Sequence, residues 1–289
     1  MYGPEDHTEY FQSFTKYTMA DLDDMFGDDV CDDTVQKEEE KQLRPASSGV
    51  LAFHNGTEEA LYHYVKNKVQ PGDVTDILKS IDEFCYTQHW MMHIGDQKLP
   101  LLDKSLKLAR ENTSNNTICA VELGSYCGYS ALYIGSQLNK ESGDHLYAIE
   151  KDPKCVKWTQ RMVTLAGLED RVTVIESAAA ELESWRTLLN KSHIDLLFID
   201  HDKSQYLTDL LLIENAHLLS TGSIVVADNV LSFGVPLTEY LTHVRDPNGL
   251  YRSSELYPGF IEYAKNRDVS IDASTSPELV DGVEISEYR

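Results

Sequence analysis

The sequence is poor in basic residues and contains no long apolar run, and these two features argue against nucleic-acid and membrane partners. Lys and Arg number 25 against 48 Asp and Glu, so the 289-residue chain carries a formal net charge of −23 at pH 7. This charge repels a phosphate backbone, and nucleic acid is therefore not an expected partner. No apolar run approaches the ~18 residues of a transmembrane helix, so no membrane partner is expected either. With 42% apolar residues, the composition is typical of a soluble globular protein.

Paired cysteines and histidine-rich metal motifs are also missing. The five cysteines are widely spaced without a CxxC pair, and the ten histidines form no HExxH motif. Neither a disulfide framework nor a zinc site is indicated, so a bound metal would need oxygen ligands. The first residues lack the basic-then-apolar pattern of a signal peptide. We therefore expect a protein of the reducing, cytoplasmic compartment.

The acidic residues are concentrated at the start of the chain. Residues 1–50 contain 13 acidic and 4 basic side chains, and the self-repulsion of such a segment favours disorder. Asp21–Gly27 lacks the ligand spacing of a calcium-binding loop. Residues 51–289 show neither repeats nor a second change of composition. The sequence predicts an acidic, disordered tail over 1–50 and a single domain over 51–289.

The remaining chain alternates helical patterns with short apolar runs. Thr57 is predicted to cap a helix that ends at Lys68, and Asp73 to cap a second helix with apolar residues at helical spacing. This alternation predicts a Rossmann-like, doubly wound α/β sheet, mostly parallel, with helices on both faces. The predicted strands are Ile118–Leu123, His145–Ile149, Arg171–Ile175, Ile194–Ile199 and Ser223–Ala227.

The pattern weakens towards the C-terminus. The stretch Asp246–Asp268 contains Pro, Gly and Tyr, and we expect it to form a lid or a wall of the ligand site. Two further strands, Val269–Ser274 and Gly282–Tyr288, are predicted to pair as an antiparallel hairpin that completes a seven-stranded sheet. Ligands of such a sheet bind at the carboxyl ends of its strands.

A glycine-containing turn follows the first predicted strand. Glu122–Ser130 leads into a helix whose N–H groups can bind a carboxylate or a phosphate. The turn is not the GxGxxG of dinucleotide-binding proteins, because Tyr126 and Cys127 would hinder the approach of a pyrophosphate. The next strand ends at Glu150, where a carboxylate can accept both hydroxyls of a ribose. An ordinary tight turn and a solvated acid are the alternatives.

Oxygen ligands follow two later strands of the predicted sheet. Asp200 and Lys203 come after one strand, and Asp228 and Asn229 come after the next. Three protein oxygens at one sheet edge suit Mg²⁺ and leave room for two oxygens of a vicinal diol. A partly desolvated lysine beside a dication releases its proton more readily, so Lys203 is suited to act as a general base. Helix caps, solvated loop residues and an ordinary surface lysine are the alternatives.

These segments occur in the order found in catechol O-methyltransferases. The sequence over Thr57–Tyr288 resembles that family in the turn at Ala166–Leu168 and in the segments Gln88–Asp96, Glu122–Ser130, Asp200–Lys203 and Ala227–Val230. A C-terminal hairpin is also usual in Rossmann-like methyltransferases. The resemblance implies that S-adenosylmethionine donates a methyl group to a phenol whose pKa is lowered by Mg²⁺.

The resemblance also implies a role for each matching residue. Asp200, Asp228 and Asn229 would hold Mg²⁺, and Lys203 would take the proton from the attacking hydroxyl. Lys203 and Asn229 would also contact the substrate, and Trp90 would form an apolar wall against its ring. The larger cofactor-binding set comprises Met92 near the sulfonium, Ile94, Glu122, Gly124, Tyr126 and Ser130 at the methionine end, Glu150 at the ribose, Ala179, and Asp200.

The sequence departs from the family around the substrate ring and the adenine. Asp202 stands where the family has a second tryptophan wall, and Phe233 stands where it has a proline that faces the ring. Ala179 and Ala180 replace a polar pair that meets the adenine, so only backbone contacts are expected there.

The family's substrate-binding glutamate has two candidates in this sequence. Glu278 has the better position in the predicted topology, between the last two strands, and we assign the role to it. The string Ile261-Glu262-Tyr263 matches the family locally and makes Glu262 the alternative.

The resulting hypothesis is a monomeric O-methyltransferase that depends on Mg²⁺ and S-adenosylmethionine and acts on a catechol-like small molecule. One alternative is the same chemistry on a different vicinal-hydroxyl substrate. Another is a cofactor-binding protein that has lost turnover, which Asp202 and Ala179 would suit. Retention of the whole metal-and-base set argues against that loss, and the missing GxGxxG argues against an oxidoreductase.

Overall fold

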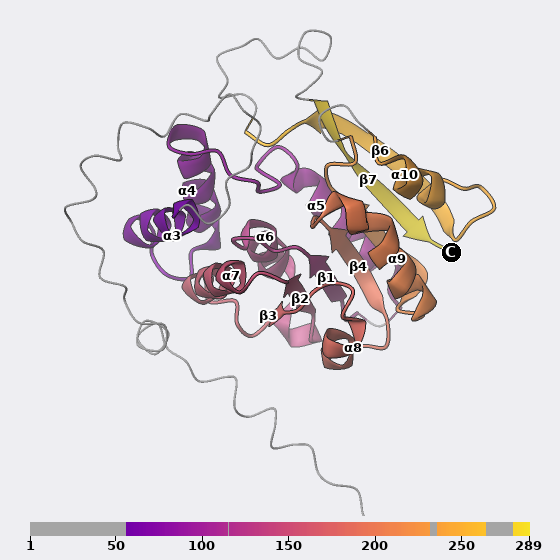
Figure 1. Cartoon of the computed structure of the whole chain (residues 1–289). Helices are drawn as coiled ribbons and strands as arrows, with labels where there is room; N and C mark the ends of the chain where they lie inside the picture. Colours follow the sequence, from indigo (N-terminus) through magenta and orange to yellow (C-terminus); the bar gives the residue numbers. More distant parts are fainter. Residues whose placement is uncertain (1–55, 115, 232–235, 264–279) are drawn as a thin grey trace, which may run out of the picture. The chain divides into compact units, whose positions relative to one another are not determined.

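The computed structural model describes residues 56–114, 116–231, 236–263 and 280–289 (Figure 1). Several predictions lie outside these residues, namely the tail over 1–50, the strand Val269–Ser274, Phe233 and Glu278. The boundaries of the single domain over 51–289 stay a prediction. Within the described ranges, no helix combines the length and the apolar character that crossing a membrane requires.

The described residues contain a seven-stranded sheet in the order β3-β2-β1-β4-β5-β7-β6. Neighbouring strands from β3 to β5 are parallel, whereas β7 is antiparallel to both β5 and β6. This arrangement confirms the predicted Rossmann-like α/β fold with its antiparallel C-terminal hairpin. The strands are β1 Cys119–Leu123, β2 His145–Glu150, β3 Val172–Glu176, β4 Ile194–Ile199, β5 Leu219–Ala227, β6 Tyr251–Phe260 and β7 Val280–Tyr288.

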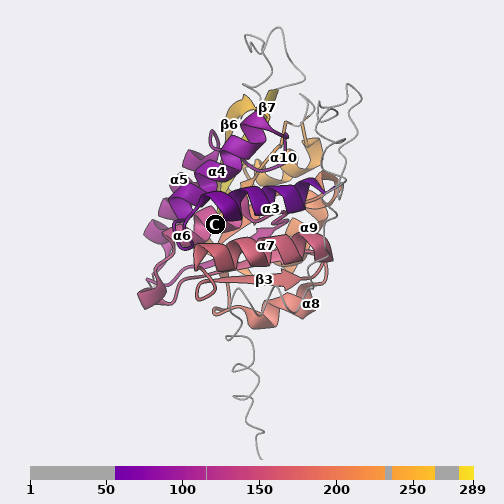
Figure 2. The same cartoon turned by 90° about the vertical axis from the view of Figure 1, so that its left-hand side faces the viewer.

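Helices cover both faces of the sheet (Figure 1). On one face, α5 lies against β4 and β5 while α6 and α7 lie against β2 and β3, and α3 and α4 pack outside them (Figure 2). On the other face, α8, α9 and α10 bury Trp185, Leu210 and Tyr240 in a core shared with strand residues such as Val121 and Leu197. The helices are α3 Thr57–Lys68, α4 Val74–Thr87, α5 Leu99–Asn112, α6 Tyr129–Gln137, α7 Pro153–Ala166, α8 Leu182–Trp185, α9 Tyr206–Asn215 and α10 Thr238–Val244.

The two opening helices follow their sequence pattern, with one difference at a cap. In α4, Ile77, Ile81 and Phe84 are buried on one face, and the Asp73 carboxylate accepts from the Asp76 N–H at 3.0 Å, as predicted. In α3, the N-cap is Gly56 rather than Thr57, and Thr57 is the first helical residue. The left-handed φ of +94° at Gly56 explains the difference, because glycine adopts this conformation without strain. The third helix, α5, was not predicted.

Most of the described part of Asp246–Asp268 is a strand rather than the expected lid or wall, although its last described residues, 261–263, include Glu262, whose carboxylate lies close to Asp228. Residues Tyr251–Phe260 form strand β6, which pairs with β7 alone at the edge of the sheet. An edge strand exposes one side to solvent, so it tolerates Pro258 and polar residues that read as a loop in the sequence. The last predicted strand, Gly282–Tyr288, lies within β7.

The main chain continues the parallel ladder by one residue beyond the strand ends. The Gly124 N–H donates to the Ile149 carbonyl at 2.9 Å, and the Asp200 N–H donates to the Leu123 carbonyl at 2.9 Å. The Asp228 N–H likewise donates to the Ile199 carbonyl at 3.1 Å. These three residues are therefore fixed side by side at one edge of the sheet, where ligands of this fold are expected.

Asp82 on α4 ties this edge to the segment after β6. Its carboxylate accepts hydrogen bonds from the Tyr129 hydroxyl at the start of α6 and from the Tyr263 hydroxyl, both at 3.0 Å. Tyr263 adopts a left-handed φ of 54°, which a tyrosine holds only when its surroundings fix it. Burial raises the pKa of Asp82 to about 6, although the two hydroxyls oppose the rise. Asp82 thus helps to position Glu262, the neighbour of Tyr263.

The raised pKa of Asp82 predicts a contribution to stability that is lost as the pH rises. The folded chain holds this proton more tightly than the unfolded chain, so the contribution is complete below about pH 4 and is lost through about pH 6. Relative to wild type, Asp82→Asn should gain up to about 1 kcal/mol of unfolding free energy between about pH 5 and 7.5, an upper bound because solvent screens the carboxyl. Urea unfolding measures this difference. Asp76→Asn, an exposed position on the same helix, is the control, and parallel pH profiles for Asp82→Asn and wild type would contradict the assignment.

Candidate active site

The carboxyl ends of β4 and β5 bring together the predicted metal and base residues. Asp200 follows β4, and the Lys203 ammonium donates to Asp200 Oδ1 at 3.0 Å and to the Tyr206 hydroxyl at 2.8 Å. The Tyr206 hydroxyl donates in turn to the Asp228 carbonyl at 3.0 Å, which links the ends of the two strands. Burial raises the pKa of Asp200, while the Lys203 ammonium opposes the rise.

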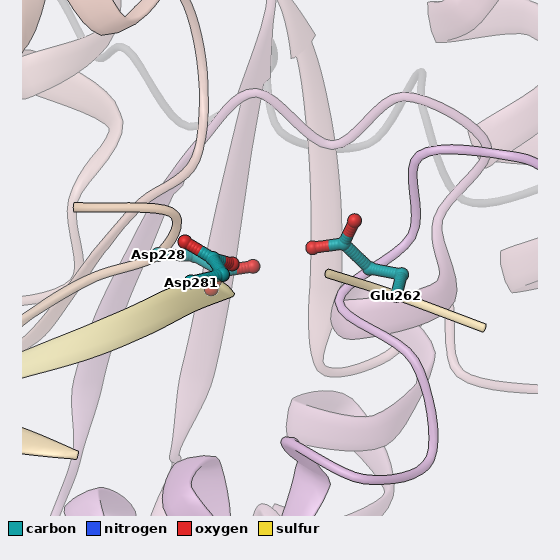
Figure 3. Close-up of side chains that lie close together, drawn as sticks. All are labelled: Asp228, Glu262 and Asp281. Carbon is teal, nitrogen blue, oxygen red and sulfur yellow. The ribbon is translucent and has the colours of Figure 1, made fainter. Parts of the chain in front are cut away.

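A second lysine lies in this site that the sequence analysis did not single out. Lys98, the N-cap residue of α5, is buried, and its ammonium donates to Asp228 Oδ1 and Glu262 Oε1 at 2.7 Å and to Asp281 Oδ2 at 2.5 Å. Burial lowers the pKa of Lys98, but the three carboxylates together raise it well above its usual value. Figure 3 shows the three acids facing one another, and their ligand atoms lie within 4.8 Å of one another.

The hydrogen bonds of Asn229 and Asp228 leave oxygen atoms for a further ligand. The Asn229 amide donates to Glu262 Oε1 at 2.7 Å and to Asp281 Oδ2 at 2.6 Å, so its nitrogen is turned to the carboxylates and its carbonyl oxygen away from them. Asp228 Oδ1 accepts from Lys98 and from the Asn229 N–H, whereas the buried Asp228 Oδ2 has no partner among the described residues. Together with Asp200, these oxygens fit a hard divalent cation.

The turn after β1 is shaped by two glycines. Gly124 has a φ of +89°, and a Cβ there would lie 2.8 Å from the Asp200 carbonyl oxygen, so no other residue permits this approach of the two strand ends. Gly128, with a φ of +88°, is the N-cap of α6. The turn thereby runs from Gly124 beside Asp200 to the start of α6, and binding of a ligand at this helix N-terminus stays a prediction.

Glu150 at the end of β2 is oriented by the same turn. Its two carboxylate oxygens accept from the Tyr126 N–H at 3.0 Å and from the Asp152 N–H at 2.9 Å. The Tyr126 hydroxyl donates to Glu58 at 3.3 Å, which connects the turn to α3. Glu150 is therefore held at the strand end where a ribose-binding acid is expected.

Glu122 is a fully buried carboxyl group in β1. It accepts a hydrogen bond from the hydroxyl of Ser130, the second residue of α6, and its other oxygen has no partner among the described residues. Burial raises the pKa of Glu122 to about 8, although Ser130 opposes the rise. An unpaired carboxyl oxygen at the start of a helix is suited to bind a cationic group of a ligand.

The segment that contains Trp90, Met92 and Ile94 lies between α4 and α5. Ile94 is buried, while Trp90 and Met92 are half-buried. The Trp90 indole N–H donates to the Glu262 carbonyl at 2.9 Å, so the ring is fixed relative to the carboxylate cluster. The predicted apolar wall is thus tied by one hydrogen bond to Glu262, the alternative candidate for the substrate-binding glutamate.

Two residues that depart from the family pattern, Asp202 and Ala179, lie in different surroundings from each other. Asp202 is exposed, and its carboxylate accepts from the Ser204 N–H and hydroxyl at the start of the 3-10 turn Lys203–Gln205. Ala179 is half-buried after β3, and its carbonyl accepts from the Trp185 indole at 3.2 Å. Asp202 is therefore a polar cap at the position where the family resemblance places an apolar wall, and Ala179 is expected to offer only backbone to a ligand.

Sequence reasoning missed Lys98 and Asp281, and it ranked Glu262 below Glu278. Glu262 lies in the described carboxylate cluster, whereas Glu278 lies outside the described residues. Asp281 is fully buried in β7, but this strand also contains Glu284, Ser286 and Glu287, so Asp281 does not stand out in the sequence. Lys98 likewise has no local signal, because only the folded chain brings it to the acids.

Comparison with known sequences identifies the same region. The profile of a family described as a methyltransferase domain matches residues 121–230. Catechol O-methyltransferase of Mus musculus is 31% identical over 233 residues, which cover 80% of this chain and 78% of the relative. Catechol O-methyltransferase B of Danio rerio is 34% identical over 215 residues, which cover 73% of this chain and 75% of the relative.

Solved structures share the fold at lower identity. An O-methyltransferase from Bacillus cereus, in complex with SAH, has a TM-score of 0.55 and 16% identity and covers 80% of this chain and 97% of its own. The O-methyltransferase TomG from Streptomyces achromogenes, in complex with SAM, has a TM-score of 0.54 and 15% identity, with coverages of 82% and 99%. Taken with the sequence relatives, the matched order of site segments shows that this chain belongs to the catechol O-methyltransferase family of class I S-adenosylmethionine-dependent O-methyltransferases.

Proposed function

We propose that this chain uses Mg²⁺ to transfer the methyl group of S-adenosylmethionine to one hydroxyl of a catechol-like small molecule. The observation that carries the proposal is the juxtaposition of oxygen ligands and a lysine at the ends of β4 and β5. Asp200, Asp228 and Asn229 are adjacent there, and Lys203 contacts Asp200. The names of the sequence relatives support the substrate class.

Asp200, Asp228 and Asn229 would hold Mg²⁺. The free Asp228 oxygen and the outward-turned Asn229 carbonyl support this assignment, because both are hard oxygen donors at one point of the sheet edge. When bound there, the ion lowers the pKa of a coordinated phenol and fixes the positions of two vicinal oxygens.

The residues of the chain itself bind, orient and deprotonate the substrate. Lys203 takes the proton of the attacking hydroxyl at its Nζ atom. Glu262 uses Oε1 for both of its hydrogen bonds in the cluster, which leaves Oε2 to accept from the second hydroxyl. Trp90, fixed to the Glu262 carbonyl, lies against the ring. Holding two reactants in line accounts for much of the acceleration in such a transfer.

The cofactor lies along the ends of β1 and β2 in this proposal. Glu150 accepts the ribose hydroxyls with the lone pairs that its two N–H bonds leave free, and the methionine end lies near Glu122 and Ser130. Met92 and Ile94, with the backbone of Gly124 and Tyr126, line the remainder, and the backbone at Ala179 faces the adenine.

A second candidate substrate is a different molecule with vicinal hydroxyls. The exposed carboxylate of Asp202 favours it, because a polar cap replaces one apolar wall of the expected ring pocket. A substrate that carries a hydroxyl or a cationic group beside its diol would suit this side better than a plain aromatic ring.

The first test is methyl transfer to a panel of catechols. With Mg²⁺, the purified chain should transfer a labelled methyl group from S-adenosylmethionine to the catechol. With EDTA, the rate of this transfer should fall by about a hundredfold or more. Asp228→Ala should behave like wild type in EDTA at every Mg²⁺ concentration, because it lacks the ligand whose free oxygen is buried at the site. Transfer that is unaffected by EDTA would rule out the metal. Transfer only to diols with a polar neighbour would favour the second candidate.

Lys203→Ala should separate catalysis from binding. Removing the base should lower kcat by about a hundredfold or more, while the Kd for S-adenosylhomocysteine changes less than about threefold. Single-turnover kinetics and calorimetry measure the two quantities. Lys140→Ala, which breaks an exposed pair with Asp170 at the opposite edge of the sheet, is the control. A wild-type kcat in Lys203→Ala would remove the base assignment.

The raised pKa of Glu122 predicts that a proton is released when the cofactor binds. With its pKa raised to about 8, Glu122 is mostly protonated at pH 7 before the cofactor binds, and a methionine ammonium nearby would drive its ionisation. Calorimetry of S-adenosylhomocysteine binding in buffers of different ionisation enthalpy should show that release. Glu122→Gln should abolish it, and Glu214→Gln, at a buried acid that accepts from Tyr251 and His243, should retain it. Equal proton release in Glu122→Gln and wild type would refute the prediction.

A further inference from the structure

We infer that Lys98 is a permanent cation of the carboxylate cluster and that it limits the site to one divalent ion. In this view its ammonium occupies a place that a second divalent ion would otherwise take, and it keeps Glu262 and Asp281 out of metal coordination. The inference rests on the proposed function, because it takes Asp200, Asp228 and Asn229 as the site of one Mg²⁺.

The geometry of the cluster is that of a cation site filled by an ammonium group. Asp228, Glu262 and Asp281 each direct one oxygen at the Lys98 nitrogen, at 2.7, 2.7 and 2.5 Å. The three side chains converge from β7 and from the segments after β5 and β6 (Figure 3). Movement of each oxygen by roughly 0.5 Å would give the distances that Mg²⁺ prefers.

The cluster retains unused oxygens inside the fold. Asp281 is fully buried, and its Oδ1 atom has no hydrogen-bond partner among the described residues, in the same way as Asp228 Oδ2. These two atoms are spare ligands of the cluster. The three acids therefore carry more negative charge and more acceptor atoms than one ammonium group can pair with. The cluster can accept a further positive charge.

The charges of Lys98, Lys203 and the four acids that surround them match one divalent ion. Asp200, Asp228, Glu262 and Asp281 supply four negative charges, and Lys98 and Lys203 supply two positive charges. The remaining two negative charges are neutralised by one Mg²⁺. Without the Lys98 ammonium these side chains would have three unmatched negative charges, and the position of the ammonium would be left surrounded by carboxylate oxygens.

Lys98 also orients the ligands of the expected metal. By binding Asp228 Oδ1 it leaves Oδ2 as the oxygen without a partner among the described residues. Lys98 also holds Glu262 and Asp281 together, and the Asn229 amide nitrogen donates to both. The Asn229 carbonyl oxygen is therefore turned away from these two carboxylates. A residue that acts through such contacts is a positioning residue.

The test counts bound Mn²⁺ by electron paramagnetic resonance on the full chain. Wild type should bind one equivalent, and Lys98→Met should bind two, because methionine keeps the apolar stem but ends one atom short of the nitrogen. Lys98→Arg, which keeps the charge, should bind one. The double variant Lys98→Met/Asp281→Asn, which removes one carboxylate charge, should return to one.

A matched control and a stability readout separate this role from a purely structural one. Lys191→Met removes another nearly buried lysine, which pairs with Asp195 at the amino end of β4, and should leave the count at one. In thermal unfolding, Mg²⁺ should raise the Tm of Lys98→Met more than that of wild type, since it replaces the missing charge.

The outcomes distinguish the inference from the proposed function. One equivalent in both wild type and Lys98→Met would overturn the role of Lys98 and leave the magnesium site standing. No equivalent in wild type would overturn both. A Lys98→Met chain that fails to fold and is not recovered by millimolar Mg²⁺ or Mn²⁺ would also overturn the inference, because an added cation should then restore the lost charge.

Discussion

Carboxylates gathered at one buried edge repel one another, and the site depends on how that repulsion is balanced. The parallel ladder fixes Asp200 beside Asp228 through main-chain hydrogen bonds, so neither side chain can retreat far. Asp281 and Glu262 add two more acids from β7 and from the segment after β6. The described structure opposes them with the ammonium groups of Lys98 and Lys203. An edge that is costly when its charges are unmatched is, for the same reason, a strong site for a divalent ion.

The position of Lys98 shows which of two electrostatic effects is larger. Lys98 is the N-cap residue of α5, where the helix dipole disfavours a positive charge by up to about 1 kcal/mol. Contacts with three buried carboxylates outweigh that cost, since removing one partner of a buried ion pair costs about 3–5 kcal/mol. A lysine that violates the usual charge preference of a helix start is therefore explained by its tertiary partners.

The same distinction between local and tertiary signals decides what the sequence predicts. The strands from β1 to β5, and the residues that follow their ends, could be predicted because apolar runs and turn residues are local patterns. Strand β6 could not, because an edge strand with one partner needs no apolar pattern. Lys98 and Asp281 gain their importance only when residues more than 180 positions apart meet, so no local pattern marks them. Glu262 was ranked below Glu278 because the first strand of the hairpin was predicted at Val269–Ser274, whereas β6 ends at Phe260 and Glu262 follows it directly.

Chemistry and substrate preference are set by different parts of the molecule. The residues proposed as metal ligands and base are fixed by strand ends and by hydrogen bonds of 3.1 Å or less, which leave little freedom for their geometry to vary. The walls of the ring pocket come from segments between elements, where Trp90 is tied to Glu262 but Asp202 is an exposed cap. A change at Asp202 can therefore alter the substrate without disturbing methyl transfer, because no hydrogen bond in the described residues connects its side chain to the metal ligands.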